Sequence, residues 1–150
     1  MIPVVAQARI PTMSREAIDR VRTLETQVLA LPQTDIATHH VIHGGMYART
    51  ICIPAGVLLT GAEIKLATLL VIQGHVSVAT DGEAIELAGY HVLPASAGRK
   101  QAFLALADTH VTMIFPSRAQ SVEDAEREFT DESDRLFSRH GENEVVITGE

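Results

Sequence analysis

The chain has 150 residues, which suits a single domain with an ordinary hydrophobic core. Apolar residues make up 46% of it and charged residues 21%, as is typical of a globular protein. The formal net charge of −7 repels phosphate backbones, so general nucleic-acid binding is not expected, although a local basic pocket is compatible with this charge.

Neither a disulfide nor a membrane segment is expected. Cys52 is the one cysteine of the chain and lies in an apolar run, which favours a buried, unreactive thiol. Residues 1–11 lack the basic start and small-residue cleavage site of a signal peptide. The longest apolar stretches, of about seven residues, are too short to span a bilayer. The sequence therefore predicts a cytoplasmic protein without membrane contact.

A helix is predicted directly after Ser14. Its apolar residues recur every three or four positions and form one stripe: Ile18, Val21, Leu24, Val28 and Leu31. Ser14 is a suitable N-cap, Glu16 places a negative charge in the first turn, and Pro32 ends the pattern. Residues 1–34 are interpreted as an N-terminal arm and helix.

Short β-type runs follow, separated by Gly and Pro. The predicted strands are residues 36–42, 47–53, 66–72, 76–79, 84–87, 91–93, 102–105 and 110–115. The expected breaks between strands include Gly61, Gly74 and Gly89. Strands at intervals of about ten residues, with no helical pattern between them, predict an all-β barrel or sandwich.

The chain becomes acidic and helical after residue 117. Ser121 and Asp124 fit a capping box, which predicts a second helix. Apolar side chains that could pack back on the barrel follow: Ala125, Phe129, Leu136 and Phe137. The tail, residues 142–150, has two open interpretations, an edge strand in a neighbouring subunit or disorder.

Two stretches carry most of the information, residues 53–78 with Pro54-Ala55-Gly56 and Gly74, and residues 87–98 with Gly89 and Pro94 to Gly98. They resemble the cupin superfamily. This resemblance implies an all-β, cupin-type double-stranded β-helix (a jelly-roll barrel) with an N-terminal helix and a C-terminal helical extension. The chain would then divide into the arm and helix (1–34), the barrel (35–117) and the acidic extension and tail (118–150).

A narrower resemblance covers residues 39–129. This stretch is similar to small cupin-like proteins of tailed bacteriophages and prophages, whose members are mostly of unknown function. It therefore implies a fold and a viral or proviral origin, with the host cytoplasm as location, rather than an activity. The matching segments are His39, Gly45-Met46-Tyr47-Ala48-Arg49, Ile53-Pro54-Ala55-Gly56, Leu59-Thr60-Gly61, Gly98-Arg99-Lys100, Ala107-Asp108-Thr109 and the acidic stretch 123–129.

The resemblance also locates the four positions that hold a metal in cupins, two His and a Glu in the first motif and a His in the second. In this chain they are Ala62, Ile64, Thr68 and Gln101. Ala, Ile and Thr are not ordinary metal ligands and Gln is a poor one, so neither a metal nor another cofactor is expected. A metal-dependent cupin enzyme is the least favoured hypothesis.

The histidines do not supply an alternative ligand set. On a strand, His39 and His43 share one face while His40 points to the other. His39 and His43 would lie about 13 Å apart and cannot share one metal unless the chain bends. Hydrogen-bonded or exposed histidines are the expectation, and His75 is expected to face solvent.

Several polar side chains are candidates for ligand binding at the barrel pocket: Tyr47, Arg49, Glu63, His91, Arg99, Lys100 and Gln101. An inward Arg49 would need a carboxylate or an anionic ligand, and the alternatives are an outer-face Arg or a structural ion pair. Arg99-Lys100 is the best local basic feature and suits a phosphate or carboxylate, with a solvated turn as the plainer interpretation. His91 is a candidate for the barrel mouth.

Together these features favour a non-catalytic, metal-free binding or interaction protein that acts through an oligomeric surface or its barrel pocket. One alternative is sequestration of a small anionic ligand, such as a nucleotide signal in host defence, read by Arg49, Arg99 and Lys100. Another is a virion or assembly protein. No catalytic residues are assigned, since no known catalytic motif is present. The flanking elements predict a homodimer or higher homo-oligomer, and a protein partner is open.

Overall fold

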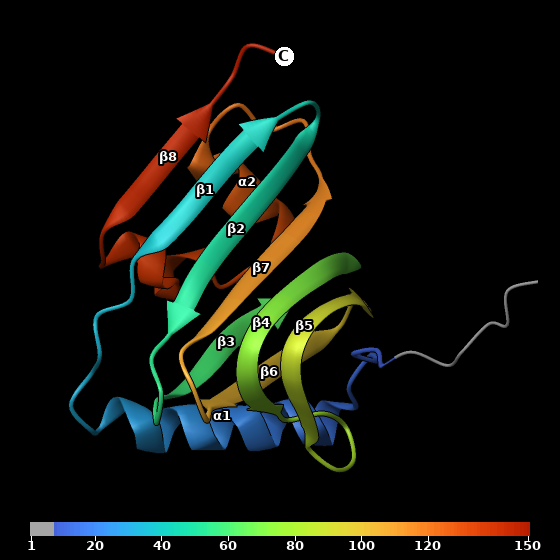
Figure 1. Ribbon diagram of the computed structural model, residues 1–150, viewed down its shortest axis with the longest axis vertical. Helices are drawn as coiled ribbons and strands as arrows, with labels where there is room; N and C mark the ends of the chain where they lie inside the picture. Colours follow the sequence, from blue (N-terminus) through green and yellow to red (C-terminus); the bar gives the residue numbers. More distant parts are fainter. Residues whose placement is uncertain (1–7) are drawn as a thin grey trace, which may run out of the picture.

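The computed structural model describes residues 8–150, which form one eight-stranded sheet flanked by two helices (Figure 1). Along the sheet the strand order is β3-β6-β4-β7-β2-β1-β8, and β5 pairs with β4. The elements in chain order are α1 (Arg15–Leu29), β1 (Thr38–His43), β2 (Met46–Ile53), β3 (Leu58–Ile64), β4 (Thr68–Val78), β5 (Ile85–Ala95), β6 (Arg99–Ala105), β7 (Thr109–Pro116), α2 (Val122–Phe129), the short 3₁₀ turns η1 (Ser133–Arg135) and η2 (Phe137–Arg139), and β8 (Asn143–Ile147).

The sheet curls over on itself along β4. Residues 69–73 of this strand pair with β7, whereas residues 76–78 pair with β6. Gly74 lies at the changeover with φ 145°, and a Cβ atom there would come within 2.5 Å of the Thr109 hydroxyl oxygen. Only glycine fits this position, and the strand can therefore pass from one half of the barrel to the other.

Two facing halves result. In Figure 1, strands β8, β1, β2 and β7 lie side by side in one half, while β3, β4, β5 and β6 curl below them. Buried apolar side chains of both halves form one core that includes Ile53, Ile72, Val76 and Phe115. The predicted all-β fold class with helices at both ends is confirmed. Among residues 8–150, no helix is long and apolar enough to cross a membrane.

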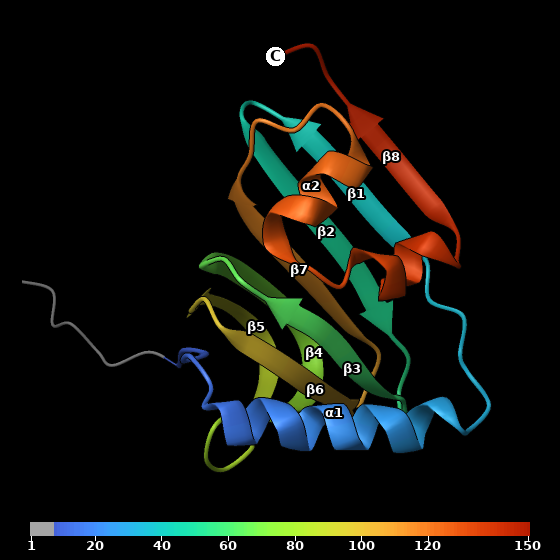
Figure 2. The same ribbon diagram turned by 180° about the vertical axis from the view of Figure 1, so that it is seen from behind.

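Helix α1 forms where the sequence predicts, but Leu31, the last residue of the predicted apolar stripe, lies beyond its end and is exposed. The Ser14 hydroxyl accepts a hydrogen bond from the Ala17 backbone N–H at 3.1 Å, which caps the first turn. Figure 2 shows α1 lying across β3 and β6. Its buried face forms a second, smaller apolar cluster with the sheet: Met13, Ala17, Ile18, Val21 and Ala102.

The C-terminal extension packs on the same sheet (Figure 2). The Ser121 hydroxyl accepts from the Asp124 N–H, so the predicted cap of α2 is confirmed. Ala125, Phe129 and Leu136 are buried in the main core, as predicted, with Phe137 packed partly buried against it.

Three details of the predicted strands are wrong. Residues 58–64 form β3, which the sequence did not indicate as a strand. Gly61, Gly74 and Gly89 lie inside β3, β4 and β5 rather than between strands, because here glycine serves the bending of long strands rather than chain reversal. The tail pairs as β8, parallel to β1 of its own chain, so neither open interpretation of the tail was correct.

Candidate functional site

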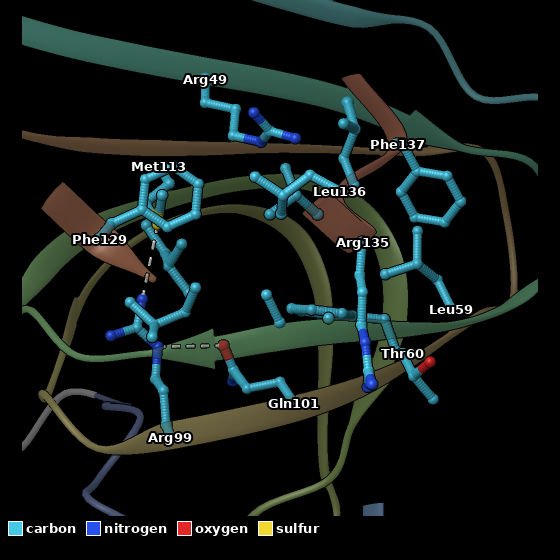
Figure 3. A pocket seen from close by; sticks show the side chains of 17 residues that line it. Arg49, Leu59, Thr60, Arg99, Gln101, Met113, Phe129, Arg135, Leu136 and Phe137 are labelled. Carbon is cyan, nitrogen blue, oxygen red and sulfur yellow. Dashed lines mark hydrogen bonds between the residues drawn. The ribbon is translucent and has the colours of Figure 1, made fainter. Parts of the chain in front are cut away.

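A cavity of about 120 Å³ lies between the two halves of the curled sheet (Figure 3). Strands β2, β3, β4, β6 and β7 supply its walls, and Phe129 together with residues 135–137 borders it from the C-terminal extension. Most of the lining is aliphatic or aromatic. The polar side chains of the lining are Arg49, Thr60, Arg99, Gln101 and Arg135.

Three of the four positions at which the cupin resemblance implies metal ligands line this cavity. Ala62, Ile64 and Gln101 line it directly. Thr68 is buried, and its hydroxyl accepts a hydrogen bond of 2.8 Å from the Arg99 guanidinium, which also lines the cavity. The guanidinium therefore contacts two of the four positions, because it also donates to Gln101.

Arg99 is held from several sides. Its Nη1 donates to the carbonyl oxygens of Ser96 at 2.8 Å and Leu66 at 3.1 Å. Its Nη2 donates to Thr68, and its Nε donates to the Gln101 side-chain oxygen at 3.3 Å. These contacts fix the guanidinium in one orientation, yet every acceptor is uncharged.

The charge of Arg99 is therefore buried without a counter-charge. The side chain is only 1% exposed and forms no ion pair with any residue that the structure describes. Burial lowers the pKa of Arg99 to about 10, which still leaves the group protonated at neutral pH. A buried, unpaired cation is costly in a folded protein, so this end of the cavity is electrostatically unsatisfied.

Gln101 adds a second unsatisfied group at the same end. It is 5% exposed, and its Nε2 has no hydrogen-bond partner among the described residues. The amide orientation follows from its neighbour, since the oxygen must face the Arg99 Nε–H donor and the NH₂ group must point away. A buried amide donor without an acceptor costs free energy comparable to a lost hydrogen bond.

Arg49 points inward and is fully compensated. Its Nη1 lies 2.9 Å from a carboxylate oxygen of Glu126, and its guanidinium lies 5.5 Å from the Phe129 ring centroid. Glu126 is 1% exposed and also pairs with Arg139 at 3.0 Å. Of the alternatives for Arg49, the structure has the inward Arg with a carboxylate partner, and Figure 3 shows it across the cavity from Arg99.

Lys100 faces the other side of β6. Its Nζ is fully buried and lies 2.8 Å from the Gly61 carbonyl oxygen, 3.0 Å from Glu25 and 3.2 Å from Glu132. The interpretation of Arg99-Lys100 as a solvated turn is wrong, because both residues belong to β6 and strand alternation buries them on opposite faces. Lys100 does not reach the cavity.

Glu63 also lies outside the cavity. Its carboxylate pairs with Arg15 and Arg22 of α1, at 3.2 and 2.5 Å. This contact fastens the helix to β3, so Glu63 is a structural residue and not a ligand-binding one.

Tyr47 and His91 are likewise not brought to the cavity. Tyr47 is fully buried, and its hydroxyl lies 2.7 Å from the His40 Nδ1, within an aromatic cluster that includes Phe115 and Phe129. The His91 Nε2 lies 2.8 Å from the Ala88 carbonyl oxygen on β5. Its ring is occupied by its own strand, so the expectation that His91 reaches the barrel mouth is wrong.

Three of the other histidines have local partners. His39 lies 2.9 Å from Glu144, and His75 pairs with Glu86 on the neighbouring strand. His40 bridges Tyr47 and the Asn143 side-chain oxygen. Burial lowers the pKa of His40, which keeps the ring neutral.

The cavity does not fit a metal ion. Within residues 8–150 no three His, Cys, Asp or Glu side chains group as a metal site would require. Ala62, Ile64 and Gln101 offer no strong metal ligand in the cavity wall, and the guanidinium of Arg99 repels a cation there. This chemistry favours a negative group in its place.

The sequence did not indicate the groups that close the cavity, notably Met113, Phe129 and Leu136. The apolar spacing of the C-terminal extension predicted that Phe129 and Leu136 pack on the barrel. It could not predict where, because a packing direction depends on contacts distant in the sequence.

No protein-family model and no curated protein matches the chain in sequence. Solved structures similar to it include cupin superfamily proteins. One is a cupin superfamily protein of Desulfitobacterium hafniense, with 15% identity over 73% of this chain and 99% of that one, at a TM-score of 0.48. Another is KdgF of a Halomonas species, with 20% identity over 62% and 87% and a TM-score of 0.47.

An enzyme is also among them. Salicylate 1,2-dioxygenase of Pseudoaminobacter salicylatoxidans shares 14% identity over 76% of this chain but only 33% of its own, at a TM-score of 0.46. These likenesses concern the fold, and no activity is carried over from them.

Proposed function

We propose that this chain is a non-catalytic binding protein that holds a small organic ligand inside its barrel cavity. The observation that carries the proposal is a mainly apolar cavity with two unsatisfied polar groups, Arg99 and Gln101, at one end. An apolar pocket with a few convergent polar groups is the usual form of a small-molecule site. Both groups gain partners when a ligand enters.

The lining supports binding rather than catalysis. The residues around the cavity include no carboxylate, imidazole or thiol among those the structure describes. General acid–base and nucleophilic catalysis rely on such groups. The cavity offers shape, apolar contact and donors, which suffice for binding.

The cavity volume limits the size of the ligand. At about 120 Å³ it is somewhat smaller than the ~150 Å³ engineered cavity that binds benzene. Pockets for drug-sized ligands span roughly 300–1,000 Å³. A nucleotide signal is therefore disfavoured on size, and a ligand of a few heavy atoms is favoured.

The proposal extends to origin and assembly. The resemblance to cupin-like proteins of tailed phages supports a viral or proviral origin, in which a binding protein would act in the host cytoplasm. A homodimer remains part of the proposal, and light scattering of the purified protein tests it. Two copies per particle are expected, and a monomer would contradict this part alone.

A cavity-filling variant tests the binding proposal. Ala62 lines the cavity, so Ala62→Leu fills it, while Ala88→Leu adds the same volume on the exposed face of β5. In a thermal-shift screen of small metabolites, ligands should stabilise the wild type and Ala88→Leu and leave Ala62→Leu unchanged. A ligand at 100 times its Kd stabilises by about 2.7 kcal/mol.

Three outcomes would contradict the proposal. A screen without any stabilising compound is one, and equal stabilisation of Ala62→Leu is another. Metal analysis that finds about one tightly held transition metal per chain would also rule out a metal-free binding site.

A further inference from the structure

We infer that the ligand is a small monocarboxylate whose headgroup pairs with Arg99 and Gln101, so that a fixed guanidinium occupies the role which a metal ion has in cupins. This inference rests on the proposed function and names the ligand class of the same cavity.

Two donors at one end of the cavity lack a good acceptor. One N–H of the Arg99 Nη2 is used by Thr68, while the Met113 sulfur, at 3.9 Å, is the remaining acceptor near this nitrogen (Figure 3). Sulfur is a weak acceptor. The Nε2 of Gln101 has no partner among the described residues. A carboxylate has two oxygens and can accept from both donors at once.

The uncompensated positive charge of Arg99 at this end of the cavity favours a ligand with a single negative charge. All acceptors around Arg99 are neutral, and a protonated guanidinium therefore leaves one net positive charge in the wall. The buried Glu126 and the half-buried Glu132 are already paired, with Arg49 and Lys100 respectively, and neither lines the cavity. A monoanion neutralises Arg99, whereas a dianion would leave an unpaired negative charge in an apolar cavity.

The apolar walls of the cavity favour a ligand with an apolar group attached to its carboxylate. Most of the remaining lining is aliphatic or aromatic, including Leu59, Leu70 and Phe103, and its other polar side chains are Arg49, Thr60 and Arg135. The cavity of about 120 Å³ is of the order of the ~150 Å³ engineered cavity that binds benzene. A short aliphatic carboxylate fits both the size and the chemistry, whereas an inorganic phosphate has no apolar part to match the walls.

Calorimetric titration with charge-matched probes tests this inference. The probes are straight and branched monocarboxylates from acetate to hexanoate, the primary amide of each acid, and inorganic phosphate, all at pH 7. At least one acid should bind the wild type about 30-fold or more tightly than its amide, because the amide cannot pair with the buried charge. Arg99→Met should lose this preference, while Arg118→Met, an equal charge change at an exposed residue outside the cavity lining, should keep it.

The variant Gln101→Glu tests the inference in the absence of any ligand. Gln101→Glu places a carboxylate beside Arg99, where the two side chains already lie 3.3 Å apart. The ligand-free variant should melt several degrees above the wild type, since the internal carboxylate neutralises the guanidinium. The same variant should bind none of the acids.

The outcomes separate the two proposals. Amides that bind as tightly as their acids would overturn the carboxylate inference and leave a binding cavity intact. Absence of binding by every acid, tighter binding of phosphate, or a Gln101→Glu variant that melts below the wild type would also overturn it. The proposed function is judged separately by its wider metabolite screen and the Ala62→Leu variant.

Discussion

The two faces of β6 differ in whether a buried positive charge has a carboxylate partner. On the outer face, Lys100 is fully buried between two carboxylates, those of Glu25 and Glu132. On the inner face, the adjacent Arg99 is equally buried and meets only neutral acceptors. Burial alone therefore says nothing about function, and the presence or absence of a counter-charge separates a structural cation from a candidate ligand-binding one.

The outer face fastens the flanking elements to the sheet. Glu132, directly before η1, contacts both Lys100 and Arg22 of α1, and Arg22 also pairs with Glu63 of β3. A network in which each charge has partners is satisfied as it stands. The inner face becomes satisfied only when something enters the cavity, and the following predictions test this contrast.

The largest effect is expected on the outer face. Lys100→Met should lower the free energy of unfolding by about 3 kcal/mol, because it leaves two buried or half-buried carboxylates short of a cation. Urea denaturation monitored by circular dichroism measures this loss. Lys65→Met is the matched control, since Lys65 and its partner Asp131 are exposed and such pairs contribute about 0–1 kcal/mol.

An equal loss of stability in Lys100→Met and Lys65→Met would contradict the contrast between the two faces of β6. It would mean that the carboxylates around Lys100 are solvated well enough to do without it. The stabilising role assigned to the ion pairs of the outer face would then be contradicted.

A smaller loss of stability is expected when the pH is lowered. Burial alone would raise the pKa of Glu132, but the Glu63 backbone N–H, Arg22 and Lys100 outweigh it and hold the pKa at about 2. Because the folded state binds this proton more weakly than the unfolded chain, the stabilisation is fully present above about pH 4.5 and is lost as the pH falls toward 2. Urea denaturation from pH 6 to 2.5 should show a steeper loss in the wild type than in Glu132→Gln. Parallel curves would show that other acids dominate the loss.

Local signals predicted the helices and the general character of the sheet. Ser14 and Ser121 cap helices through hydrogen bonds to residues three positions on, which a sequence displays directly. The partner of β8 could not be predicted in this way, because β1 lies about a hundred residues earlier in the chain. Pairing of distant strands depends on the assembled core.

The candidate site was predicted in part. The cupin resemblance indicated Gln101 as a pocket position, and the structure places it in the cavity wall. The predicted strand began at residue 102, three residues too late, since Gly98-Arg99-Lys100 resembles a turn. Had it begun at Arg99, alternation would have placed Arg99, Gln101 and Phe103 on one face and Lys100 on the other. Which face is the inner one still depends on α1, which covers the outer face at Ala102.

The smallest effect is expected on the inner face without ligand. Arg99→Met removes hydrogen bonds to the Leu66 and Ser96 carbonyl oxygens, but it also removes an unpaired buried charge. It also removes the donors to the Thr68 and Gln101 side chains. Lost hydrogen bonds of about 1 kcal/mol each oppose the relief of a buried charge that costs several kcal/mol, so the free energy of unfolding should fall by less than it does for Lys100→Met. Urea denaturation of the ligand-free protein measures it beside Lys100→Met. A loss as large as that of Lys100→Met would mean that Arg99 is needed to hold the loop before β6 in place, and its unpaired charge would then be a structural cost with no ligand to offset it.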